Sequence, residues 1–177
     1  MKTHFIIDGY DLIFRGAQVG DPVVQERTGR ARRQLVDLVC KFTVSRGYTA
    51  TVIFDGMGKD PDVLPPLSDA MGVKVIFAKP GEKVYPLLDR AIGASMDPDK
   101  STVVTSHPRI LELADKVGMG VSRPREFFER MRGELKKRGE FESDEPTDKR
   151  FTVGANDVAF WENMVKKGKR GPREEIR

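Results

Sequence analysis

The 177-residue chain has one cysteine, two histidines and one tryptophan. A single cysteine excludes an internal disulfide framework and a metal cluster built on cysteines, and two histidines exclude a histidine-rich metal centre. No apolar run approaches the roughly 20 residues that a helix needs to cross a bilayer. The first residues lead straight into a short apolar strand and do not have the form of a signal peptide. The sequence therefore predicts a cytoplasmic protein that contacts no membrane.

There is also little excess of charge of one sign. The net charge is +4 at pH 7, from 31 basic and 27 acidic residues. The most basic segment is near the end of the chain and contains Lys166, Lys167, Lys169 and Arg170. A solvated tail is the simpler interpretation of such a segment. The alternative is that it binds the phosphates of a nucleic acid.

Short apolar runs alternate with helical patterns over the first part of the chain. Strands are predicted at residues 4–7, 49–54, 73–78, 101–105 and 120–122, and the main helices between them at residues 28–46, 82–95 and 108–118. Each strand is an almost continuous apolar run, which is typical of strands that helices cover on both faces. Because connections between parallel strands are right-handed, the sequence predicts a doubly wound parallel α/β sheet.

The pattern changes after the last predicted strand. Residues 124–137 have the pattern of a charged helix with one apolar side, and a last helix is predicted from Asn156. We therefore divide the chain into an α/β domain at residues 1–122 and a C-terminal helical extension with a basic tail at residues 123–177.

Polar side chains follow three of the predicted strands, at the edge where open parallel sheets bind ligands. Asp8 follows the first strand, Asp55 the second, and Ser106 and His107 the fourth. A carboxylate at such a place must be hydrated, hydrogen-bonded or bound to a cation. The alternative for each aspartate is that it only caps the helix or turn that follows.

Two further carboxylates are predicted at the same edge. Asp11 reaches it through a turn after the first strand, and Glu82 stands at the start of a predicted helix. Four carboxylates that gather there would repel one another, and a hard divalent cation such as Mg²⁺ relieves this repulsion. Such an ion can activate water and stabilise the transition state of phosphoryl transfer.

The sequence lacks the motifs of several other kinds of binding site and active site. No Gly-x-Gly-x-x-Gly and no Walker sequence follows the first strand, so a dinucleotide cofactor is not expected. His107 precedes Pro108 at the start of a helix, where a capping role is simpler than a role in a Ser-His-Asp triad. Cys40 lies in the apolar stripe of a helix and is most simply a buried thiol.

The segment Ile6-Ile7-Asp8-Gly9-Tyr10-Asp11-Leu12-Ile13 resembles the Asp-Gly-Tyr-Asn motif that opens the NYN domains of the PIN-like nuclease superfamily, in particular the YacP-like group. The resemblance spans most of residues 4–165 and continues through Arg33-Gln34-Leu35, residues 52–56, Gly81-Glu82, residues 103–106 and residues 156–161. Known members are metal-dependent endoribonucleases, and some act on messenger RNA at the ribosome. The resemblance implies a PIN-like α/β fold and an RNA partner, with the ribosome as a possible place of action.

Some of the carboxylates that the resemblance leads us to expect are replaced. Glu82 matches the glutamate of a Gly-Glu-Thr-Ala-Asp pattern, but Tyr85 stands in place of its aspartate. His107 stands in place of the aspartate of a Thr-Ser-Asp pattern, and Asp11 replaces the asparagine of the opening motif. A histidine nitrogen suits zinc or manganese better than magnesium, and a neutral tyrosine is a poor Mg²⁺ ligand.

Two hypotheses follow from the resemblance. In the first, the protein is a divergent metal-dependent endoribonuclease, in which Asp8, Asp11 and Glu82 hold Mg²⁺ or Mn²⁺. Asp55 supports them in catalysis, and His107 is a substitute ligand. In the second, the same fold binds RNA or the ribosome without cleaving it, because two expected carboxylates are absent. In both, basic side chains hold the RNA backbone, and these are Arg30, Arg33, Lys166, Lys167, Lys169 and Arg170.

A third interpretation, a small-molecule phosphatase or a nucleotide-binding α/β protein, predicts tight binding of a mononucleotide without affinity for RNA.

Overall fold

The computed structural model describes residues 3–18, 21, 23, 29–56 and 72–140. They all belong to one compact unit, residues 1–145. The helix predicted from Asn156 and the basic segment at Lys166, Lys167, Lys169 and Arg170 lie outside the described residues. Within the described ranges, no helix is both long enough and apolar enough to span a bilayer.

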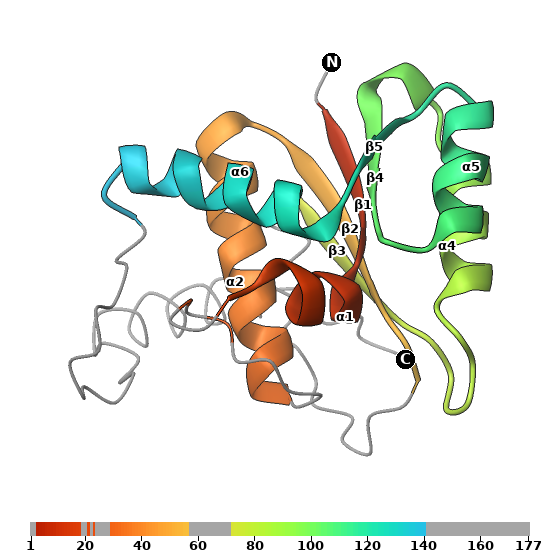
Figure 1. Cartoon of the computed structure of the whole chain (residues 1–177), viewed down its shortest axis with the longest axis horizontal. Helices are drawn as coiled ribbons and strands as arrows, with labels where there is room; N and C mark the ends of the chain where they lie inside the picture. Colours follow the sequence, from red (N-terminus) through yellow and green to blue (C-terminus); the bar gives the residue numbers. More distant parts are fainter. Residues whose placement is uncertain (1–2, 19–20, 22, 24–28, 57–71, 141–177) are drawn as a thin grey trace, which may run out of the picture. The chain divides into compact units, whose positions relative to one another are not determined.

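Five parallel strands form one sheet (Figure 1). They are β1 (His4–Asp8), β2 (Thr49–Phe54), β3 (Val73–Phe77), β4 (Ser101–Val104) and β5 (Gly120–Ser122). Their order in the sheet is β3-β2-β1-β4-β5, so the chain builds outward from β1 and then returns to its other side. The predicted doubly wound sheet is confirmed. The order reverses between β1 and β4, and such a reversal leaves a crevice at the carboxyl ends of these strands.

Helices cover both faces of the sheet. The helical segments are α1 (Gly9–Asp11), the π-helical turn η1 (Leu12–Gly16), α2 (Gly29–Arg46), α4 (Tyr85–Gly93), the 3-10 turn η2 (Pro98–Lys100), α5 (Pro108–Lys116) and α6 (Pro124–Lys137). In Figure 1, α2 and α6 lie on one side of the sheet and α4 and α5 on the other.

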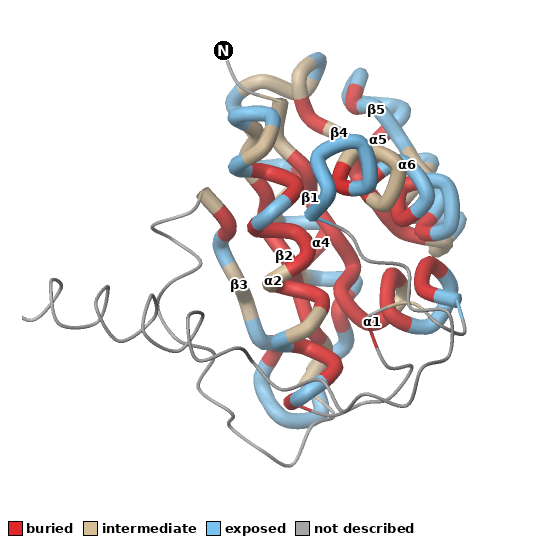
Figure 2. Tube along the Cα trace, turned by 90° about the vertical axis from the view of Figure 1, so that its left-hand side faces the viewer, coloured by how far each residue is buried: buried red, intermediate tan, exposed pale blue. Residues whose placement is uncertain are grey.

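Neighbouring residues of the central strand β1 enter two separate apolar clusters, because successive side chains of a strand point to opposite faces. Phe5 and Ile7 belong to the cluster that contains the apolar residues of α2 and α6. Ile6 belongs to the cluster formed with α4 and α5. All three side chains are buried, and Figure 2 shows the buried residues along β1 and β2. Burial on both faces explains why these strands are continuous apolar runs.

The last described helix packs on the core of the α/β sheet. Its predicted apolar side is buried as expected, with Phe127, Phe128, Met131 and Leu135. The ring centroid of Phe127 lies 5.0 Å from that of Phe5 in β1 and 5.7 Å from that of Phe42 in α2. The division of the chain after residue 122 stays a prediction about folding units. In the structure, the apolar residues of α6 belong to the same buried cluster as those of β1 and α2.

One predicted helix begins later than expected. The sequence placed Glu82 at its first turn, but α4 begins at Tyr85. Glu82 closes a turn with Lys79 instead: the amide of Glu82 donates to the carbonyl of Lys79 at 2.8 Å, and the amide of Lys79 donates to the Glu82 carboxylate at 3.0 Å. Gly81, with φ of +81°, supplies the left-handed conformation that this turn requires.

Candidate functional site

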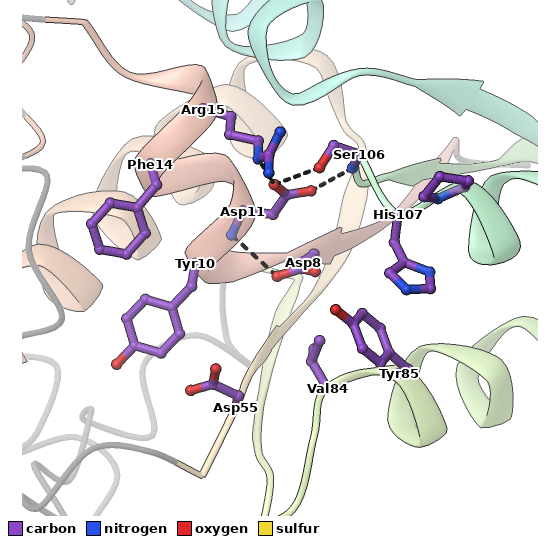
Figure 3. Close-up of a pocket in the computed structure, with 11 residues that line it drawn as sticks. Asp8, Tyr10, Asp11, Phe14, Arg15, Asp55, Val84, Tyr85, Ser106 and His107 are labelled. Carbon is purple, nitrogen blue, oxygen red and sulfur yellow. Dashed lines mark hydrogen bonds and ion pairs between the residues drawn. The ribbon is translucent and has the colours of Figure 1, made fainter.

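A cavity of about 580 Å³ opens where the strand order reverses (Figure 3). Side chains from four segments line it: the stretch from the end of β1 into η1, the end of β2, the start of α4 and the loop between β4 and α5. These segments meet because the carboxyl ends of parallel strands share one edge of the sheet. The cavity therefore lies where the order of the strands predicts a ligand.

Asp8 is the last residue of β1 and is only 6% exposed. Its carboxylate accepts a hydrogen bond from the amide of Asp11 at 3.2 Å and so caps α1. The hydroxyl of Thr105 lies 3.4 Å from the other oxygen of Asp8 and 3.2 Å from an oxygen of Asp11. One hydroxyl can donate to only one of these acceptors at a time. The capping contact of the alternative interpretation is thus present, and it uses only part of the hydrogen-bonding capacity of the carboxylate.

The surroundings of Asp8 oppose its ionisation. Burial raises the pKa of Asp8 to about 7, and the negative charges of Asp11 and Asp55 act in the same direction. The hydrogen bonds from the amide of Asp11 and the hydroxyl of Thr105 lower the pKa, but by less. Among the described residues, no basic side chain contributes to the pKa of Asp8, and a cation beside Asp8 would supply this counter-charge.

Asp11 makes more contacts than Asp8. The hydroxyl of Ser106 donates to one oxygen of Asp11 at 2.8 Å, and the amide of Ser106 donates to the other (Figure 3). The guanidinium of Arg15 lies 3.1 Å from the same carboxylate. Asp11 therefore joins the segment after β1 to the loop after β4, and its charge is already balanced by Arg15.

The two residues that replace expected carboxylates contact each other. The ring centroids of Tyr85 and His107 lie 3.8 Å apart, with an angle of 36° between the ring planes. His107 stands at the N-cap position of α5, but its side chain makes no capping hydrogen bond. Both residues line the cavity. An aromatic pair therefore occupies the wall of the cavity where the resemblance leads us to expect acidic groups.

The structure brings some predicted site residues together and keeps others apart. Asp55 lines the same cavity as Asp8 and Asp11. Glu82 does not line it, because its carboxylate is bonded in the turn before α4. Arg30 and Arg33 are exposed in the first turns of α2 and do not line the cavity either.

Arg32 is a residue near the site that the sequence analysis missed. It is 3% exposed, and its guanidinium donates to the hydroxyl of Tyr10 at 2.7 Å. A signal was available, because Arg32 precedes Leu35 by three residues and Val39 by seven, which places it on the apolar side of α2. An arginine on such a stripe is expected to hold a polar partner inside the protein.

The donor set limits which metal the cavity could hold. In the part of the chain that the structure describes, no three His, Cys, Asp or Glu side chains are placed to bind one metal ion. Asp8 and Asp55 nevertheless face one cavity. Mg²⁺ is often held by one or two carboxylates, with water and substrate phosphates as its other ligands. The described residues of the cavity fit an oxygen-preferring cation of this kind, and by themselves they do not fit a metal that needs a full set of protein ligands.

Comparisons with known proteins agree with this architecture. The structure of Rae1 (YacP) from Bacillus subtilis matches with a TM-score of 0.57 and 19% identity, over 94% of this chain and 92% of that one. A tryptophan-to-leucine mutant of the same protein matches with a TM-score of 0.56 and 16% identity, over 77% of this chain and 79% of that one. No curated protein matches significantly. The sequence profile of the YacP-like NYN domain matches residues 5–163. The chain therefore belongs to the family of YacP-like NYN domains, which have the fold of PIN-like nucleases.

Proposed function

We propose that the protein is a metal-dependent endoribonuclease and that the cavity between the carboxyl ends of β1 and β4 is its active site. The observation that carries this proposal is the placement of Asp8 and Asp55 in that cavity, where the strand order reverses. Membership of a family with a nuclease fold supports RNA as the substrate.

The proposal gives each side chain at the site a separate task. Asp8 and Asp55 would hold Mg²⁺ or Mn²⁺, which when bound would withdraw electron density from a phosphate and make a water molecule more acidic. Asp11 fixes the loop after β4 through Ser106. Arg15, whose side chain is 69% exposed at the cavity, would contact a phosphate of the substrate.

The role predicted for Glu82 in catalysis and metal binding stays a prediction. Its carboxylate would have to release the amide of Lys79 before it could reach a bound ion. A substitution of Glu82 by glutamine keeps the size of the side chain and tests this directly. Loss of cleavage in that variant, with the fold intact, would show that the reaction needs the carboxylate of Glu82.

Cleavage of RNA by the full chain tests the proposed function. An end-labelled pool of single-stranded RNA is incubated with Mn²⁺ or with EDTA. We expect cleavage only with Mn²⁺, and we expect Asp8→Asn to abolish it. Asp89→Asn is the matched control, because Asp89 is an exposed aspartate of α4 that does not line the cavity. Cleavage that survives Asp8→Asn would reject the proposed site.

One observation favours a second function, which is RNA binding without cleavage. The contacting, tilted rings of Tyr85 and His107 occupy the two positions where the resemblance leads us to expect carboxylates. Under this alternative, RNA binds with an affinity that falls steeply with salt, and no RNA is cleaved with either metal. Cosedimentation with ribosomes tests the further prediction, drawn from the resemblance, that the target RNA is at the ribosome.

A further inference from the structure

Two pairs of aromatic rings line the cavity, and in Figure 3 they lie on opposite sides of Asp8. Tyr10 and Phe14, from the segment after β1, have ring centroids 6.3 Å apart and an angle of 27° between their planes. Tyr85 and His107, from α4 and the loop after β4, are 3.8 Å apart with an angle of 36°.

In each pair one ring is accessible and the other supports it. Phe14 is 39% exposed and Tyr85 is 38% exposed. Behind Phe14, Tyr10 is buried, and it is fixed by the hydrogen bond from Arg32 and by the ring of Phe54 at 5.2 Å. Behind Tyr85 lies the ring of His107, the N-cap residue of α5. Each exposed ring is therefore backed by a second ring.

The ring of Phe14 is much more exposed than the two residues that precede it in η1. Its neighbours in η1, Leu12 and Ile13, are fully buried and anchor that segment. Phe14 instead leaves more than a third of its surface open in a cavity that also contains carboxylates. A large apolar ring exposed in a polar cavity is a typical place for a flat ligand to stack.

We propose that Phe14 and Tyr85 are stacking platforms for two bases of single-stranded RNA, one on each side of a phosphate near Asp8. This proposal rests on the proposed function, because it needs RNA in the cavity. Bases of unpaired RNA are free to stack on aromatic side chains, whereas bases in a duplex are already stacked and paired. Stacking also tolerates any base, since every base has a π face. The site would thus select unpaired RNA without reading its sequence.

Matched substitutions separate the π face of each ring from its volume. Binding of a labelled single-stranded RNA is measured by fluorescence anisotropy in EDTA, which prevents metal-dependent cleavage, and in parallel in Ca²⁺. We expect Phe14→Leu and Tyr85→Leu each to raise Kd by about five- to one-hundredfold. The controls Phe14→Tyr and Tyr85→Phe keep an aromatic ring and should bind within about twofold of the unchanged protein.

A second measurement does not depend on the folding of any variant. The unchanged protein is offered an abasic oligomer, which has the same phosphates and length as the RNA but lacks its bases. We expect the unchanged protein to bind this oligomer at least about tenfold more weakly than the RNA.

The outcomes distinguish the two proposals. Equal binding of RNA and abasic oligomer by the unchanged protein, or leucine variants that keep full affinity, would overturn the stacking platforms and leave RNA cleavage at the cavity intact. Failure of the unchanged protein to bind RNA in either condition would overturn both.

Discussion

Asp8 is the residue at which stability and proposed function conflict. Its pKa of about 7 exceeds the ordinary value of 3.8, so the folded protein binds a proton at Asp8 that the unfolded chain releases. The stability that this proton contributes is complete below pH 3.8 and is lost as the pH rises through 7. Without a cation, ionised Asp8 costs the folded state on the order of 4 kcal/mol above pH 7.

Asp8→Asn should therefore stabilise the metal-free protein at alkaline pH, because the amide is neutral and nearly isosteric. In EDTA at pH 8 we expect the free energy of unfolding, measured in urea, to increase by about 1–4 kcal/mol. At pH 4 to 5 the gain should be much smaller, because Asp8 is then protonated in the folded protein. A difference between variant and unchanged protein that does not vary with pH would contradict this description of Asp8.

The glycine that follows Asp8 is also required by its surroundings. A Cβ added at Gly9 would lie 2.3 Å from the ring of Phe54, so Gly9→Ala must displace either that ring or the turn that carries Asp8 and Asp11. We expect a loss of about 1–3 kcal/mol in the free energy of unfolding, together with lower activity. Gly133→Ala in α6 is the control, because nothing lies within 4 Å of its added Cβ. If both variants were equally stable, the close contact at Gly9 would be refuted.

The residues of the site differ in how well the sequence predicted them. Asp8 and Asp55 were placed correctly at one edge, because each directly follows a strand whose apolar run is unmistakable. Glu82 was placed in a helix because periodicity cannot reveal that its own side chain closes a turn. The contact between Tyr85 and His107 depends on how α4 and α5 pack, which no local pattern encodes.

At the scale of elements, the strands were predicted almost to the residue. β2 and β5 match their predicted ranges, and β3 and β4 each end one residue earlier than predicted. The inner strands of the sheet are buried on both faces and are therefore almost continuous apolar runs. The residues at which such a run begins and ends can be recognised in the sequence. Segments without periodicity were predicted less well, because the short helical segments α1 and η1 were expected only as a turn after the first strand.

Substitutions in α6 test how much the packing of this helix on the sheet contributes to the free energy of unfolding. Phe127 is fully buried between rings from β1 and α2, so Phe127→Ala should lower the free energy of unfolding by about 3–5 kcal/mol. Arg125→Ala, two residues earlier in the same helix at a side chain that is 70% exposed, should change it by less than about 0.5 kcal/mol. Denaturant unfolding of both variants measures the difference. A loss below about 1 kcal/mol at Phe127 would mean that α6 does not stabilise the sheet.

At the scale of the whole molecule, the charge near the end of the chain bears on RNA binding. The segment with Lys166, Lys167, Lys169 and Arg170 was identified from the sequence alone. If it contacts phosphates, removal of residues 166–177 should weaken RNA binding and reduce the slope of log affinity against log salt concentration, because fewer counterions are released.

Binding titrations at several salt concentrations, on the full and the shortened chain, measure that slope. The thermal midpoint of the shortened chain serves as the control for folding. An unchanged slope would reject a role for this segment in binding phosphate, whatever happens to the affinity at one salt concentration.

The account as a whole depends on a cation in the cavity where the strand order reverses. A crystal of the full chain soaked in Mn²⁺ and measured for anomalous scattering tests this most directly. We expect an anomalous peak beside the carboxylates of Asp8 and Asp55. A soaked crystal with no peak in that cavity, or with its Mn²⁺ bound elsewhere while the cavity holds none, would contradict the account.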